Sequence, residues 1–232
     1  MIRIFIGYDH REAAAFGVLA HSIHLRASRP VTIAPLMLSQ LRHVFDREIE
    51  PLQSTTFSFS RFLTPYLCDF EGWSLYMDCD MIMRDDVAKL WALRDDRHAL
   101  MVVKHEHKPK ETIKFLGAVQ TKYEKKNWSS VMLFNNARCK ALTPDYVNTA
   151  SGLELHQFKW LDDDASIGAL PGDWNHLVGY EAPDPQAKLV HYTQGGPYLD
   201  DYVDCEYSKE WFDERDDMLN ITQKTLADVS TG

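Results

Sequence analysis

Leu75-Tyr76-Met77-Asp78-Cys79-Asp80-Met81-Ile82-Met83 is an apolar run interrupted by two carboxylates. Side chains alternate along an extended strand, so Asp78 and Asp80 project to the same side. Two close carboxylates repel each other, and neither ionises readily beside an apolar core. A divalent cation resolves this conflict, because hard cations prefer carboxylate oxygen. The plainer interpretation is a turn after a strand with both acids solvated, and the tripeptide alone does not exclude it.

Apolar strands are expected to alternate with helices on both sides of this run. The predicted strands cover residues 2–6, 31–36, 73–77, 99–103, 128–134 and 188–191. The predicted helices cover residues 11–28, 58–67, 86–91 and 142–156. Alternation of this kind is typical of an α/β domain with a mostly parallel sheet.

Several polar side chains directly follow predicted strands. They are Asp9, Asp78, Asp80, Asn135 and His191. In open sheets of this class, ligands bind outside the carboxyl ends of the strands. The shared position therefore predicts that these side chains meet in one site.

The length of 232 residues fits one large domain, or one domain with a tail. We expect a catalytic domain over residues 1–198, with residues 199–232 as an acidic C-terminal helix or tail that packs on this domain or extends from it. Hydrophobic residues make up 45% of the chain, which is enough for a sizeable core. The formal net charge of -9 argues against broad non-specific binding of nucleic acid, although a local basic patch stays compatible with it.

The cysteines and the N-terminus indicate a cytoplasmic protein. The four cysteines are scattered without a CxxC pair, so we expect reduced thiols and neither a disulfide framework nor a zinc site. The apolar run at residues 1–7 is too short for a signal peptide, and no stretch approaches the roughly 20 apolar residues of a membrane helix.

Three motifs follow one another at fixed spacing. They are Phe59-Ser60-Arg61-Phe62-Leu63-Thr64-Pro65-Tyr66-Leu67, then Tyr76-Met77-Asp78-Cys79-Asp80-Met81-Ile82, then Asp86-Val87 with Leu90-Trp91. Their order and spacing resemble family 8 of the retaining glycosyltransferases, of bacterial or phage type. Further matches are Val131-Met132-Leu133-Phe134-Asn135-Asn136, then Leu170-Pro171 with Trp174-Asn175, then His191-Tyr192. The resemblance covers roughly residues 2–198 and implies the GT-A fold, a Rossmann-like mixed, mostly parallel sheet flanked by helices.

The resemblance implies a metal-dependent transfer of a hexose from a UDP-sugar to a hydroxyl acceptor. Its metal ligands would be Asp78, Asp80 and His191, holding Mn²⁺ or Mg²⁺ on the diphosphate of the donor. An imidazole beside two carboxylates suits Mn²⁺ somewhat better than Mg²⁺. Without this context, His191 would more often be a structural histidine at a strand end.

Other positions match family contacts to the donor. Arg61 would hold phosphate or pair with the acids of the metal site, and the plainer interpretation is a surface arginine. Tyr8 and Asp9 would stack on uracil and accept from its ring N–H. Asp9 capping the following helix is an equally good interpretation. Asn135 and Asn136 are expected to contact substrate.

The sequence departs from the family at two places. The segment Trp160-Leu161-Asp162-Asp163-Asp164 resembles an Asp-Gln-Asp motif that lies against the donor sugar, but Asp163 stands at the glutamine position. Asp162 or Asp163 is expected to contact the sugar; Asp163 could instead be a nucleophile or a helix-start carboxylate. The family also has a diphosphate-binding lysine where this chain has Gly196, so the backbone N–H groups of Gly195 and Gly196 are expected to cradle phosphate.

The segment of residues 104–126 is rich in lysine and histidine. Its basic residues are Lys104, His105, His107, Lys108, Lys110, Lys114, Lys122, Lys125 and Lys126. A solvated loop is the simpler interpretation. The alternative is a contact with an anionic acceptor, such as a phosphorylated glycan or nucleic acid.

Two other functional classes remain open at this point. A nucleotidyltransferase or phosphotransferase could use the same acids with two metal ions, although residues 7–10 supply no Gly-rich or basic phosphate loop. A non-catalytic module that binds nucleotide-sugars is the third class, and the missing lysine near Gly196 is the observation in its favour.

Overall fold

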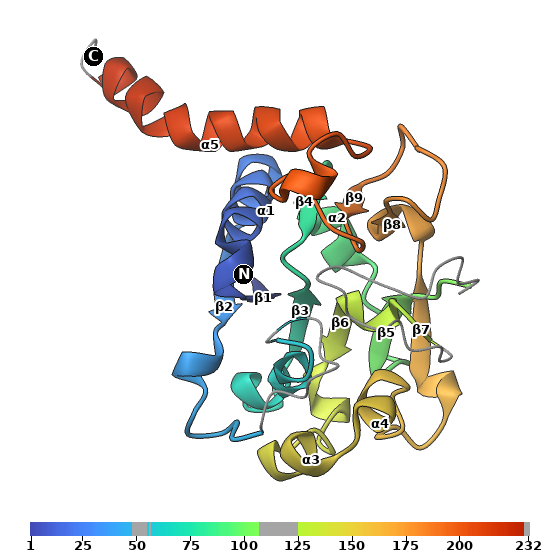
Figure 1. The fold of residues 1–232 in the computed structure, drawn as a ribbon. Helices are drawn as coiled ribbons and strands as arrows, with labels where there is room; N and C mark the ends of the chain where they lie inside the picture. Colours follow the sequence, from blue (N-terminus) through green and yellow to red (C-terminus); the bar gives the residue numbers. More distant parts are fainter. Residues whose placement is uncertain (48–54, 56, 107–124, 230–232) are drawn as a thin grey trace.

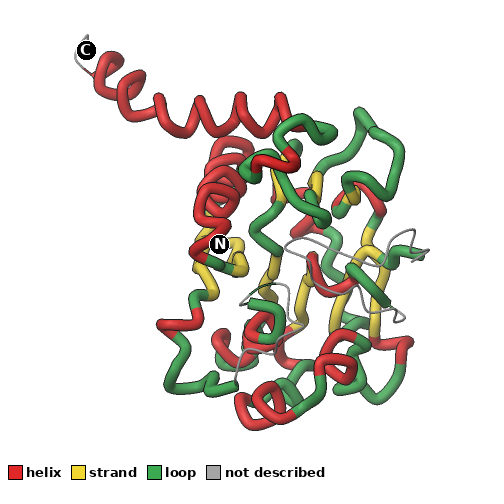
Figure 2. Tube along the Cα trace, in the orientation of Figure 1, coloured by secondary structure: helices red, strands yellow, loops and turns green. Residues whose placement is uncertain are grey.

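In the computed structural model, which describes residues 1–47, 55, 57–106 and 125–229, a six-stranded sheet forms the centre (Figure 1). The strand order is β2-β1-β3-β6-β5-β7. The strands are β1 (Ile2–Gly7), β2 (Val31–Leu36), β3 (Trp73–Met77), β5 (Leu100–Val103), β6 (Val131–Asn135) and β7 (Ile167–Leu170). Helices and loops flank this sheet (Figure 2), and the predicted α/β class with a mixed, mostly parallel sheet is confirmed.

The direction of one strand differs from the rest. Strand β1 is parallel to β2 and β3, and β5 is parallel to β7. Strand β6 is antiparallel to both of its neighbours, with Trp73 opposite Asn135 and Met77 opposite Val131. The beginning of β6, rather than its end, therefore lies beside the carboxyl end of β3.

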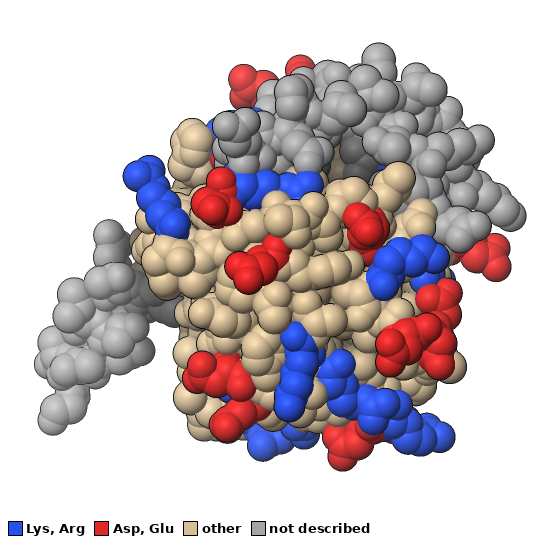
Figure 3. Space-filling view, turned by 90° about the horizontal axis from the view of Figure 1, so that it is seen from below, with Lys and Arg blue, Asp and Glu red and all other residues tan. Residues whose placement is uncertain are grey.

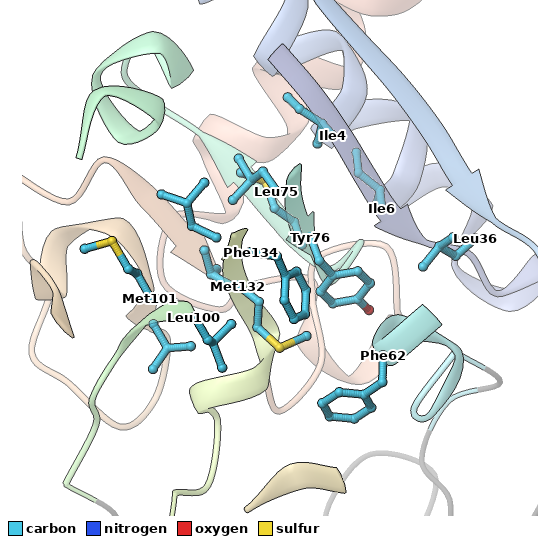
Figure 4. Packing of buried hydrophobic residues seen from close by; sticks show 14 of the residues in the cluster. Ile4, Ile6, Leu36, Phe62, Leu75, Tyr76, Leu100, Met101, Met132 and Phe134 are labelled. Carbon is cyan, nitrogen blue, oxygen red and sulfur yellow. The ribbon is translucent and has the colours of Figure 1, made fainter. Parts of the chain in front are cut away.

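Apolar side chains of the central strands form the core. Figure 4 shows Leu75 and Tyr76 of β3 packed among residues of β1 and β6, including Ile4 and Phe134. These side chains are 1% exposed or less. Burial of apolar surface on this scale is the main favourable contribution to folding, and it fixes the end of β3 in place.

A second, smaller sheet follows directly from the first. It contains β4 (Met81–Met83), β9 (Leu189–His191) and β8 (His176–Leu177) in the order β4-β9-β8. Only residues 78–80 separate β3 of the large sheet from β4 of the small one. Met81 pairs with His191, so the segment of the two acids and the histidine are held together by strand pairing.

The helices are shorter than the sequence predicts. Helix α1 (Ala13–Arg26) and α2 (Val87–Ala92) agree with expectation, but residues 58–67 form two 3-10 helices, η3 (Ser60–Leu63) and η4 (Tyr66–Cys68). The predicted helix at 142–156 is divided into α3 (Pro144–Thr149) and α4 (Gly152–His156). The division arises because Ala150 is extended and Ser151 starts α4 with a capping box formed with Glu154.

The C-terminal helix α5 (Ser208–Val229) packs against α1 (Figure 1). Its Trp211 is 1% exposed and joins a second apolar cluster with residues of α1 and the small sheet, including Val18 and Val190. Glu214 is buried between His21 and Arg26 of α1, at 2.6 Å and 2.7 Å. The predicted division of the chain at residue 198 stays a prediction.

Candidate metal and substrate site

A pocket of about 130 Å³ lies where the two sheets meet. Its walls include Arg61, Asp78, Asp80, His191 and Gly195. The two acids come from the β3–β4 junction, and the histidine comes from the end of β9. Strand pairing thus brings residues that are distant along the chain to one place, as the carboxyl-end position of Asp78 and Asp80 predicts.

Asp78 is fixed by two neighbours and is only 9% exposed. The hydroxyl of Tyr76 donates to its Oδ1 at 2.7 Å, and Nη1 of Arg61 lies 2.9 Å from the same oxygen. The same guanidinium nitrogen donates to the carbonyl of Ser129 at 2.8 Å. Burial raises the pKa of Asp78 above its usual range, while Arg61 opposes this change. Arg61 is buried and held by the site, so it is not a surface arginine.

Asn175 controls the ring of His191. Nδ2 of Asn175 donates to Oγ of Ser130 at 2.9 Å, which leaves Oδ1 of Asn175 facing Nδ1 of His191 at 3.0 Å. Since this oxygen can only accept, Nδ1 of a neutral His191 carries the proton and Nε2 carries the lone pair. The tautomer is therefore assigned from the hydrogen-bond network.

The lone pair of His191 faces a carboxylate. Its Nε2 lies 3.3 Å from Oδ1 of Asp80. Within the described residues, this buried oxygen receives no hydrogen bond. Two acceptors that face each other repel, and a cation between them removes the repulsion. The orphaned oxygen thus fits a site built for a positive ion.

Asp78, Asp80 and His191 together offer a ligand set. One ligand atom from each lies within 4.8 Å of the other two. Two hard carboxylate oxygens and one imidazole nitrogen suit a divalent cation such as Mn²⁺. The residues present therefore fit the group that the sequence predicts.

The two residues predicted to contact the nucleotide base, Tyr8 and Asp9, differ in burial. Asp9 is 1% exposed, caps the short helix after β1, and pairs with Arg11 at 2.7 Å. The capping interpretation is thus confirmed for Asp9. Tyr8 is half-buried, and its ring lies edge-on to Phe16 at 5.4 Å.

Gly195 and Gly196 lie in contact with neighbouring tyrosines. Gly195 lines the pocket and has φ of +141°, a backbone conformation that favours glycine. Its N–H donates to the carbonyl of Tyr192 at 2.9 Å. At Gly196, a Cβ would lie 2.5 Å from Cε1 of Tyr198. The ring of Tyr198 therefore occupies the space beside Gly196.

One positional prediction is wrong. The strand-end position predicts Asn135 beside the acids, but the antiparallel direction of β6 carries Asn135 and the following Asn136 to the opposite end of β3. There the side chain of Asn136, fully buried, binds Ser74 and the carbonyl of Glu71. The residues that precede β6, Ser129 and Ser130, lie in the pocket instead.

Asp162 and Asp163 are both exposed. Oδ1 of Asp163 accepts from the N–H of Ser166 at 3.0 Å and caps a 3-10 helix, which agrees with its interpretation as a helix-start carboxylate. Neither acid is among the described wall residues of the pocket. Their contact with a sugar stays a prediction.

The sequence did not single out several wall residues. Glu12 is 4% exposed, and its Oε1 accepts from the hydroxyl of Tyr198 at 2.9 Å. Burial and the charge of Asp80 raise the pKa of Glu12 to about 7. His156 of α4 lies against Phe62 and bonds Oγ of Ser129 through Nδ1 at 2.8 Å. Their sequence signal is weak, because Glu12 stands in a predicted helix start and His156 at a predicted helix end.

Most of the basic segment, residues 107–124, lies outside the described residues. The described part binds the protein itself: Lys104 donates to the carbonyl of Ile167, and Lys125 pairs with Asp164. On the face that Figure 3 shows, Lys and Arg side chains lie among Asp and Glu side chains. An anionic acceptor thus stays a prediction.

Comparison with known proteins identifies relatives. No protein-family model matches the chain. Protein CDI of Arabidopsis thaliana is 47% identical over 235 residues, which cover 97% of this chain and 90% of that protein.

Solved structures share the fold at low identity. The apo form of the glycosyltransferase GlyE of Streptococcus pneumoniae TIGR4 has a TM-score of 0.61 and 16% identity, covering 97% of this chain. This chain spans 63% of the length of that structure. The galactosyltransferase LgtC, in complex with donor and acceptor sugar analogues, has a TM-score of 0.57 and 14% identity over 92% of this chain and 95% of its own. Mouse xyloside xylosyltransferase 1 has a TM-score of 0.52 and 10% identity over 82% of this chain. The fold is thus that of the GT-A glycosyltransferases.

Among the described residues, the helices are either too short or too polar to cross a lipid bilayer.

Proposed function

The chain belongs to the family of Protein CDI of Arabidopsis thaliana, and from the pocket in its GT-A-type fold we propose that it is a metal-dependent glycosyltransferase. The proposed reaction moves a hexose from a UDP-sugar to an acceptor hydroxyl with retention of configuration, as in family 8. The observation that carries the proposal is the cluster of Asp78, Asp80 and His191 at the junction of the two sheets. The bacterial or phage type and the cytoplasmic location remain predictions.

The proposed ligands would hold Mn²⁺ or Mg²⁺ against the diphosphate of the donor. Such an ion neutralises negative charge that develops on the leaving phosphate as the bond to the sugar breaks. Asp80 and His191 face each other with two unshared electron pairs, and Asp78 lies beside them. The imidazole favours Mn²⁺ over Mg²⁺ as the working ion.

Arg61 is proposed to position the acid at the end of β3. Its Nη1 contacts both Asp78 and the carbonyl of Ser129, and so it joins β3 to the residues before β6. A buried ion pair of this kind fixes the direction of the carboxylate and leaves the site less negative before a donor binds. Contact between Arg61 and phosphate stays part of the proposal.

The donor is proposed to extend from the metal ligands toward the loop after β9. Gly195 brings backbone to the pocket wall, but its N–H already donates to the carbonyl of Tyr192. Contact between phosphate and the backbone of Gly195 and Gly196 stays part of the proposal. Tyr8 and Asp9 are the proposed contacts to uracil, and Asp162 and Asp163 are the proposed contacts to the sugar. The acceptor is a glycan or another hydroxyl compound, either neutral or anionic.

Release of UDP tests this function. With UDP-glucose or UDP-galactose and Mn²⁺, the wild-type protein is expected to release UDP slowly to water and faster with a suitable acceptor. Asp80→Ala is expected to lower the rate at least about 100-fold, since it removes a ligand of the ion. Thr32→Ala, at an exposed position on β2, is the control and keeps the wild-type rate. Equal rates for Asp80→Ala and wild type, or pyrophosphate in place of UDP, would contradict the proposal.

A further inference from the structure

Glu12 is a buried carboxylate that the proposed ligand set does not use. It follows β1 in the 3-10 helix η1 (His10–Glu12), and its side chain makes no capping hydrogen bond to α1. It lines the same pocket as Asp80. Two neutral groups donate to it: the phenol of Tyr198 at 2.9 Å and the thiol of Cys79 at 3.5 Å.

The place of Tyr198 depends on a glycine. A side chain at Gly196 would meet the Tyr198 ring at 2.5 Å and the Cβ of Tyr192 at 3.2 Å. The bare Gly196 backbone therefore admits the ring whose hydroxyl holds Glu12. Beside Gly196 the chain thus places a neutral phenol bound to an acid, and Tyr198 adds no positive charge there.

The charges of the pocket wall do not balance. The described wall carries three carboxylates, Glu12, Asp78 and Asp80, and one guanidinium, Arg61. Arg61 pairs with Asp78 at 2.9 Å. Glu12 and Asp80 are then left as two carboxylates, which one divalent cation would neutralise.

We propose that Glu12 is an outer carboxylate of the metal site, which strengthens cation binding by its charge and by accepting a hydrogen bond from the ion's hydration water. Glu12 acts from outside the direct ligand set, because the atoms that lie within 4.8 Å of one another come from Asp78, Asp80 and His191 only among the described residues. Substitution of residues that hydrogen-bond the ligands or the bound water of a metal commonly changes metal affinity about 10- to 100-fold. The proposal rests on the metal site of the proposed function.

Mn²⁺ binding to the nucleotide-free protein tests the role of Glu12. The signal of free aqueous Mn²⁺ in electron paramagnetic resonance gives the affinity directly, at mildly alkaline pH. Glu12→Gln keeps the size of the side chain and an acceptor for Tyr198 but removes the charge, and it is expected to weaken Mn²⁺ binding about tenfold. In the absence of metal, Glu12→Gln is expected to unfold at a higher temperature than wild type, because the repulsion of Asp80 is removed.

Tyr198→Phe separates the metal-site role from simple packing. This variant keeps the carboxylate and removes the hydroxyl that holds it, so it is expected to bind Mn²⁺ no more weakly than wild type. If Glu12 only anchors Tyr198, Tyr198→Phe loses affinity and Glu12→Gln does not, which would overturn the proposal. Glu214 of α5 is another buried acid, and it does not line this pocket. Glu214→Gln is therefore the matched control and is expected to keep the wild-type affinity for Mn²⁺.

The outcomes distinguish this inference from the proposed function. Wild-type protein that binds no Mn²⁺ overturns both. Wild-type binding that Glu12→Gln leaves unchanged overturns the role of Glu12 alone and leaves the ligands Asp78, Asp80 and His191 in place.

Discussion

His191 presents a lone pair to the pocket only while Asn175 accepts from the other ring nitrogen. Asn175 is fully buried, and its own direction is set by Ser130. The chain of contacts runs from Ser130 through Asn175 to His191 and ends at Asp80. A residue with no place in the proposed ligand set thus decides which ring nitrogen meets the ion.

Asn175→Ala removes the acceptor that fixes His191. The ring is then free to change tautomer or direction, so Mn²⁺ affinity is expected to fall about 10- to 100-fold. Isothermal titration of the nucleotide-free protein with Mn²⁺ measures this loss. Asn175→Asp keeps an acceptor for Nδ1 and is expected to bind more tightly than Asn175→Ala. Equal affinity of wild type and Asn175→Ala would show that His191 needs no such support.

For single residues of the site, the sequence predicts contacts between near neighbours in the chain and misses those between distant residues. Asp78 and Asp80 are recognisable because a strand places alternate side chains on one side. The role of Arg61 is found only through the resemblance, since its partners are distant in sequence. The position of His191 after a strand predicts that it shares the site, but its role as a ligand comes from the resemblance. Glu12 leaves only a weak sequence signal, because its partners Tyr198 and Cys79 are distant in sequence.

At the scale of elements, strand direction decides which residues share an edge. A predicted strand gives the same apolar pattern whether it runs parallel or antiparallel to its neighbour. The pattern of β6 was visible in the sequence, but its pairing with β3 was not. This ambiguity explains why Asn135 was expected in the site and why Ser129, at the other end of β6, was not.

The apolar pattern also fails to predict where some helices begin and end. The pattern of residues 142–156 predicts one helix, whereas the structure has α3 and α4. The signal for the break is local: Ser151 and Glu154 form a capping box, in which each side chain binds the backbone N–H of the other. This short second helix carries His156 to the pocket wall.

Ser151→Ala is expected to lower the free energy of unfolding by about 1 kcal/mol, because it removes the N-cap of α4. Urea unfolding followed by circular dichroism measures the change. Ser151→Asp keeps a capping oxygen and is expected to lose less than the alanine variant. A loss of stability that is the same for Asp and Ala would mean that the cap contributes little.

At the scale of the whole molecule, α5 closes a second core. Trp211 packs with Val18 of α1, Ile82 of β4 and Tyr192 after β9. The helix is therefore bound to elements that carry the metal site, although it contributes none of the proposed ligands. The GT-A-type fold is predicted from motif order. The sequence leaves open whether the C-terminal helix packs on the domain or extends from it, because its acidic composition does not identify the buried Trp211.

Trp211→Ala is expected to lower the free energy of unfolding by about 3–5 kcal/mol, since it opens a large cavity in this cluster. Thermal and urea unfolding of the full chain measure the loss. Phe212→Ala, at the half-buried neighbouring position, is the control and is expected to lose less. A loss below about 1 kcal/mol for Trp211→Ala would show that α5 is held by its ion pairs rather than by this cluster.

The junction between the two sheets also limits how the length of the chain can change. Asp78 follows the last residue of β3, and Asp80 precedes the first residue of β4. The N–H of Asp78 donates to the carbonyl of Ser130, and the carbonyl of Asp80 accepts from Tyr192, so both ends of the junction are bonded to other segments. One inserted or deleted residue here would shift one sheet against the other and reverse the side to which an acid points. Among the described connections, this one is therefore expected to tolerate length changes least, whereas the loops that join the outer strands can vary.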